Sequence, residues 1–224
     1  MPLYFSSSRK YPWPMAFLMA GLVHLLYRLL FEEVNSFLSG YLDTYLSGPA
    51  TGTLLLLIIY PIYRFILEDD RDPVEESLAP IRGHSSAFLQ AILLGLATGM
   101  IVWFIALFWP DTGKSTLPPW QGIVAIVLWT PVVEEIYYRF LLQGFLMRSM
   151  KSGGPSALAL FLPLIFATGC FIFSHDYFIA PVLLIPSLAF GLIFIKWNVT
   201  AATVSHAVYN AVLIGGTYVS QNQG

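Results

Sequence analysis

Long apolar stretches dominate this sequence and constrain its fold more than any other feature. An α-helix needs roughly 20 mostly apolar residues to cross a bilayer. Seven stretches approach or reach that length, at residues 13–31, 49–67, 86–109, 120–147, 155–174, 178–195 and 199–216. The sequence therefore predicts an all-α membrane protein, a bundle of about seven transmembrane helices, or eight if one stretch is divided.

The composition agrees with a chain whose main solvent is lipid. Of the 224 residues, 57% are hydrophobic and only 11% are charged, whereas soluble proteins carry about 25% charged residues. So few charges cannot cover the surface of a water-soluble globule of this size. The net charge of −2 gives no electrostatic basis for binding nucleic acid. With no internal repeat, residues 1–224 are expected to form a single transmembrane domain.

The segments between the stretches contain turn-forming and charged residues. Ser47-Gly48-Pro49 and Pro118-Pro119 predict breaks between helices, and residues 68–84 form the one clearly water-soluble loop. The basic pair Arg9-Lys10 before the first stretch resembles the start of a signal peptide. No small-residue cleavage site closes that stretch, so we expect it to be retained as the first span.

The distribution of basic residues predicts the orientation, because Lys and Arg accumulate in cytoplasmic connections. With seven spans and a cytoplasmic N-terminus, only Lys114 falls outside. The inside segments then contain Arg9, Lys10, Arg64, Arg71, Arg82, Arg148, Lys151 and Lys196. This pattern predicts an N-terminus inside and a C-terminus outside.

The fourth stretch contains charged residues at its middle, where a charge costs about 2.5–3.5 kcal/mol on insertion scales. Such residues are retained when they are paired, hydrated or functional. Glu135 and Arg139 are four residues apart, so they share a helix face and can pair. Glu134 points about 100° away on a helix of 3.6 residues per turn. It is therefore expected to find another partner or to act chemically.

Two further polar clusters lie in apolar stretches. His175 ends the fifth stretch, and His206 and Asn210 share one face of the seventh. A carboxylate such as Glu134 can take a proton from water as a general base. Histidine and asparagine can donate hydrogen bonds to the oxyanion that forms when an amide is hydrolysed. These are the parts that a protease needs.

The ordered set Glu-Glu-x-x-x-Arg, Phe-x-x-x-His and His-x-x-x-Asn resembles the CPBP family, the CAAX proteases and bacteriocin-processing (Abi) proteins. These motifs occupy residues 134–139, 171–175 and 206–210. The similarity includes the type II CAAX prenyl endopeptidases and covers a core of about residues 90–216. It implies an intramembrane endopeptidase that cleaves a membrane-associated protein or peptide, such as a C-terminal tail or a CaaX-type substrate. The expected partners are membrane lipid and this anchored substrate.

The resemblance also implies a role for each motif residue. Glu134 would be the general base, with His175 helping to hold the water. His206 and Asn210 would form the oxyanion site, supported by the Glu135 and Arg139 pair. A glutamate-dependent reaction without a metal is preferred, but Glu134, His175 and His206 are also a set that can hold zinc.

Other interpretations of the same residues are kept. The charged residues of the fourth stretch can form a structural ion-pair network, and His206 and Asn210 can form hydrogen bonds that hold helices together. The chain could then be a non-catalytic binding or immunity protein, or a proton-coupled transporter. If Glu134, His175, His206 and Asn210 lie close together in the folded protein, a protease is favoured over these alternatives. Because His175 ends its stretch while Glu134 lies mid-stretch, the helices must tilt for the two to meet.

A polar stripe in the first stretch receives a structural interpretation. His24, Arg28 and Glu32 follow one another at intervals of four residues and therefore share a face. We expect a stripe near a helix end in which the Arg28 side chain extends towards the interface.

Overall fold

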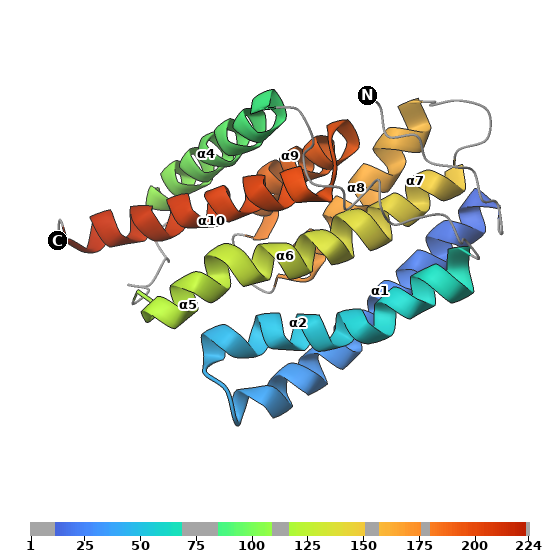
Figure 1. Ribbon diagram of the computed structural model, residues 1–224, viewed down its shortest axis with the longest axis horizontal. Helices are drawn as coiled ribbons and strands as arrows, with labels where there is room; N and C mark the ends of the chain where they lie inside the picture. Colours follow the sequence, from blue (N-terminus) through green and yellow to red (C-terminus); the bar gives the residue numbers. More distant parts are fainter. Residues whose placement is uncertain (1–11, 69–84, 109–116, 151–156, 176–179, 223–224) are drawn as a thin grey trace.

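The structure, a computed structural model, describes residues 12–68, 85–108, 117–150, 157–175 and 180–222, and its regular elements are all helices (Figure 1). The first elements are α1 (Trp13–Ser39), α2 (Thr44–Pro61) continued by η1 (Ile62–Glu68), and α4 (Ser85–Leu107). A central run follows, made of α5 (Trp120–Val124), η2 (Ala125–Trp129), α6 (Thr130–Glu135), η3 (Ile136–Gln143) and α7 (Gly144–Met150). The last elements are α8 (Ala157–Phe173), η4 (Ala180–Leu183) leading into α9 (Leu184–Lys196), and α10 (Val199–Asn222).

Within the described residues the helices group into seven rods, and each rod corresponds to one of the seven predicted apolar stretches. This confirms the all-α membrane bundle. In the part of the chain that the structure describes, three helices are long and apolar enough to cross a membrane, at Trp13–Ser39, Thr44–Phe65 and Ser85–Leu107, while Ala157–Phe173 and Pro181–Lys196 are shorter apolar helices. The orientation stays a prediction, and several residues that carry it (Arg9, Lys10, Arg71, Arg82, Lys114 and Lys151) lie outside the described residues.

The run from α5 to α7 forms the centre of the molecule (Figure 1). It lies between the α1–α2 pair on one side and the α4–α10 pair on the other, and α8 and α9 pack against η3. Every residue from Tyr137 to Ser149 is buried. A helix that is buried all round must be apolar or internally paired, so the charged residues of this run need partners within the protein.

The predicted break at Ser47-Gly48-Pro49 is wrong. Helix α2 begins earlier, at Thr44, because Asp43 caps it by accepting a hydrogen bond of 3.0 Å from the Tyr45 N–H. Pro49 is then accommodated inside the helix. The break at Pro118-Pro119 is confirmed, since Pro119 directly precedes the first residue of α5. The water-soluble loop lies outside the described residues beyond Glu68.

Two glycines allow α4 to approach α10 closely. A Cβ atom at Gly95 would collide with the main-chain oxygen of Ser205, and one at Gly99 would lie 2.8 Å from Cβ of Val212. Small residues four apart are a common device for close packing of membrane helices. This contact fixes the position of α10, the helix that contains His206.

Gly95→Ala is expected to lower the free energy of unfolding by about 1–3 kcal/mol, the usual cost of overpacking a well-packed contact. Thermal unfolding of the purified protein in detergent measures the change. Gly169→Ala is the matched control, because a Cβ at this helical glycine meets nothing within 4 Å. It should leave the stability unchanged or raise it, and equal losses in both variants would contradict the close α4–α10 contact.

Candidate active site

The main chain of the central run changes its hydrogen-bonding pattern just before the paired glutamates. In η2 the Thr130 N–H donates to the carbonyl of Ala125, five residues back, as in a π-helix. The next residue, Pro131, has no N–H. The Ile126 carbonyl instead accepts a hydrogen bond of 2.8 Å from the side-chain amide of Asn210 on α10. A local irregularity of the helix thus binds Asn210 beside the glutamates.

Glu135 and Arg139 form the buried ion pair that their spacing predicts. Nε of Arg139 lies 3.2 Å from Oε2 of Glu135, and both side chains are fully buried. Arg139 also donates through Nη2 to Oγ of Ser187 at 2.8 Å, and this hydroxyl donates to Oγ1 of Thr168 at 3.3 Å. Opposite charge and the hydrogen bonds to Glu135 and Ser187 offset part of the cost of burying the guanidinium.

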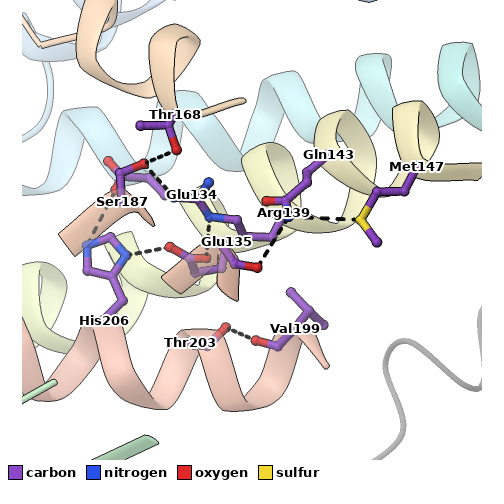
Figure 2. Close-up of polar contacts among 11 residues, drawn as sticks. Glu134, Glu135, Arg139, Gln143, Met147, Thr168, Ser187, Val199, Thr203 and His206 are labelled. Atoms are coloured by element: carbon purple, nitrogen blue, oxygen red, sulfur yellow. Dashed lines mark hydrogen bonds and ion pairs between the residues drawn. The ribbon is translucent and has the colours of Figure 1, made fainter. Parts of the chain in front are cut away.

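His206 lies between the two glutamates, as Figure 2 shows. Its Nδ1 is 2.9 Å from Oε1 of Glu135, and its Nε2 is 3.7 Å from Oε2 of Glu134. The ring stacks on Phe190, with centroids 4.6 Å apart and planes 19° apart. Because a carboxylate can only accept, Nδ1 carries the proton in the bond to Glu135. The ring is therefore held by its Nδ1 hydrogen bond to Glu135 and by the stacked Phe190 ring, and its Nε2 is directed towards Glu134.

Glu134 faces a cavity of about 300 Å³, which we call the polar pocket. Its side chain is 22% exposed, whereas Glu135 is fully buried. The polar pocket is lined by Glu134, His175, His206 and Asn210, by Thr130 and Tyr209, and by the apolar residues Val102, Ile126, Phe171, Val182, Leu183 and Leu213. The two adjacent carboxylates thus have different environments, one paired with arginine and one open to a cavity.

His175 is held at the end of α8 by the main chain. Its Nδ1 lies 2.7 Å from the carbonyl oxygen of Phe171, and its ring packs against the Phe171 ring at a centroid distance of 4.5 Å. A carbonyl only accepts, so Nδ1 is the protonated nitrogen and Nε2 of the neutral ring can accept a hydrogen bond. This is the state that a histidine needs in order to hold a water through one of its protons.

The four residues expected to be catalytic therefore line one pocket. Glu134 and His206 approach each other directly, while the hydrogen bonds resolved for His175 and Asn210 go to main-chain carbonyls. Helix α8, with 17 residues, ends just before His175, and there His175 lines the same pocket as Glu134.

Several residues of the site were not predicted from the sequence. Ser187 accepts a hydrogen bond from Arg139 and donates one to Thr168, and Thr130 and Tyr209 line the polar pocket. Hydroxyl groups are frequent in membrane helices, so their presence alone did not separate these residues from others. Only the packing of α8, α9 and α10 against the central run shows which of them face the site.

The zinc alternative requires Glu134, His175 and His206 as ligands. In the described parts of the chain, no three His, Cys, Asp or Glu side chains are grouped so that they could hold a metal ion. The nitrogens of His206 instead face the two glutamates, and Nδ1 of His175 faces a carbonyl. The metal-free reaction therefore stays a prediction.

Arg139→Met should lower the free energy of unfolding by about 3–5 kcal/mol, because it leaves Glu135 as an uncompensated buried charge. Ser187→Ala should cost less, about 2 kcal/mol, since it removes one hydrogen bond to a charged group. Denaturant unfolding in detergent micelles gives both values. The double variant Glu135→Gln with Arg139→Met should recover part of the loss, and strictly additive losses would contradict the pairing.

Comparison with known proteins identifies the part of the chain that contains this site. Residues 116–212 match the model of the Rce1-like family, described as type II CAAX prenyl endopeptidase Rce1-like. No curated protein and no solved structure matches the chain. The matched range contains all three motifs, from Glu134 to Asn210, and so confirms the resemblance predicted from the sequence. The chain is a membrane protein whose residues 116–212 are similar to the Rce1-like family of type II CAAX prenyl endopeptidases.

Proposed function

We propose that this protein hydrolyses a peptide bond of a membrane-anchored substrate with a water molecule activated by Glu134. The observation that carries the proposal is the polar pocket. It brings a partly exposed carboxylate, two histidines and an asparagine to one cavity inside an otherwise apolar bundle. Ionisable groups in such surroundings are costly and mark functional sites.

In the proposed reaction Glu134 takes one proton from the water, and His175 accepts a hydrogen bond from the other through Nε2. The hydroxide adds to the carbonyl carbon of the scissile amide, and the carbonyl oxygen becomes an oxyanion. When the C–N bond breaks, Glu134 delivers its proton to the leaving amine. Proton uptake and release balance, so Glu134 ends the cycle as a carboxylate.

His206 and Asn210 are proposed to stabilise the oxyanion. Asn210 uses one N–H for the Ile126 carbonyl, which leaves its second N–H for the substrate. His206 donates its Nδ1 proton to Glu135, so it can donate from Nε2 only as an imidazolium. Glu135 faces that charge and Arg139 in turn faces Glu135, which keeps the donor oriented before the reaction begins.

A second cavity supports a lipid-modified substrate. This apolar groove, of about 510 Å³, is lined by Leu117, Ile123, Val124, Val127, Leu128, Ala211, Ile214, Gly215 and Tyr218. It shares α10 and η2 with the polar pocket, since Ala211 and Val127 line the groove while their neighbours Asn210 and Ile126 line the pocket. We therefore propose that the groove receives the hydrocarbon chain of a CaaX-type tail while its peptide enters the polar pocket.

Glu134→Gln tests the general base, because it keeps the size of the side chain but removes its basicity. With a farnesylated fluorogenic CaaX peptide and purified protein, kcat should fall about 10²–10⁴-fold. Glu33→Gln, on an exposed carboxylate of α1, is the matched control and should cleave normally.

Other outcomes of this cleavage assay would contradict the role of Glu134 or favour another function. Cleavage that survives in Glu134→Gln overturns the role of Glu134. Cleavage by the wild type that 1,10-phenanthroline abolishes would favour the zinc-dependent version. Binding of the peptide with no turnover by the wild type would favour the non-catalytic binding protein.

Gly215→Leu tests the groove, because a side chain at Gly215 enters open space there and meets no neighbour within 4 Å. Displacing about two buried CH₂ groups, each worth about 0.8 kcal/mol, should raise KM for the farnesylated peptide about tenfold. The KM for the same peptide without its lipid should not change. Gly48→Leu, at another glycine with no neighbour within 4 Å, is the control. An equal change for both peptides would contradict the groove as the lipid site.

A further inference from the structure

Helix α1 contributes a charged contact to the site although it lies outside the matched range 116–212. Nη1 of Arg28 donates a hydrogen bond of 2.9 Å to the carbonyl oxygen of Ser174. Nη2 of the same guanidinium lies 3.2 Å from Oε1 of Glu32, whose side chain is 65% exposed. The guanidinium thus connects the exposed side of α1 with the end of α8.

The Ser174 carbonyl is a group that needs such a donor. The last carbonyls of a helix have no partner further along the helix, and a cation there is favourably placed in the helix dipole. Helix α8 ends at Phe173. The next two N–H groups turn back, that of Ser174 to Cys170 and Phe171 and that of His175 to Ile172. Arg28 binds the carbonyl that follows this turn.

His175 is the residue directly after this carbonyl. Its ring is bound to the Phe171 carbonyl, and its main chain follows directly on the Ser174 carbonyl that Arg28 binds. Tyr138, one turn after Glu134, packs its ring against that of Phe171 with centroids 5.1 Å apart. The turn that contains His175 is therefore held from α1 on one side and from the central run on the other.

We propose that Arg28 is a positioning residue for His175. By fixing the Ser174 carbonyl, it keeps the His175 ring on the Phe171 carbonyl and keeps Nε2 directed for a hydrogen bond in the polar pocket. This corrects the interpretation of Arg28 as a side chain that only extends towards the interface. The consequence for catalysis rests on the proposed function, whereas the effect on the His175 ring does not.

The ring can be observed without any substrate. Histidine labelled with ¹³C and ¹⁵N in the full-length protein in micelles reports the tautomer of each ring, and His175→Gln assigns the signal of His175. In the wild type His175 should show a single tautomer protonated at Nδ1. Arg28→Gln should give a mixture, Arg28→Lys should restore the single form in part, and Glu32→Gln should match the wild type. An unchanged His175 signal in Arg28→Gln overturns the proposal.

Cleavage of the farnesylated CaaX peptide gives the second readout. Misplacing a reacting group slightly costs rate more than binding, so Arg28→Gln should lower kcat about 10- to 100-fold with KM unchanged. Arg28→Lys should recover part of kcat, and Glu32→Gln should behave as the wild type. A changed His175 signal with a normal kcat overturns the positioning role in catalysis. If the wild type cleaves nothing, the proposed function fails, and the tautomer alone decides whether Arg28 positions His175.

Discussion

A fully buried carboxylate and a fully buried guanidinium, those of Glu135 and Arg139, lie 3.2 Å apart in the centre of the bundle. Each charge would be too costly there alone, so the surrounding helices are arranged around the pair. Helix α9 contributes Ser187 to Arg139, and α10 contributes His206 to Glu135. The positions of these helices, and with them the geometry of the polar pocket, depend on this one ion pair.

The pair also explains how two adjacent glutamates can differ in chemistry. Glu135 is occupied by Arg139 on one oxygen and by His206 on the other. Glu134, about 100° round the helix, is left with a partly exposed carboxylate that His206 approaches at 3.7 Å. One glutamate is thus held by Arg139 and His206, while the other lines the polar pocket.

Main-chain carbonyls bind two of the site residues, Asn210 and His175. The π-helical η2 and Pro131 leave the Ile126 carbonyl to Asn210, and the end of α8 offers the Phe171 carbonyl to His175. A π-helical segment inside an α-helical run is a frequent mark of a functional site. Irregular backbone in a membrane protein is tolerated where such partners satisfy its polar groups.

The sequence alone determined the seven helical rods, because a long apolar stretch has few alternatives to a helix in lipid. It also determined the Glu135–Arg139 pair, which depends only on a spacing of four residues within one helix. Contacts between distant segments were decided by the tertiary structure: His206 between two glutamates, Ser187 on Arg139, and Arg28 on the carbonyl before His175. Such contacts depend on which faces of separate helices pack together, and spacing within one helix carries no information about that.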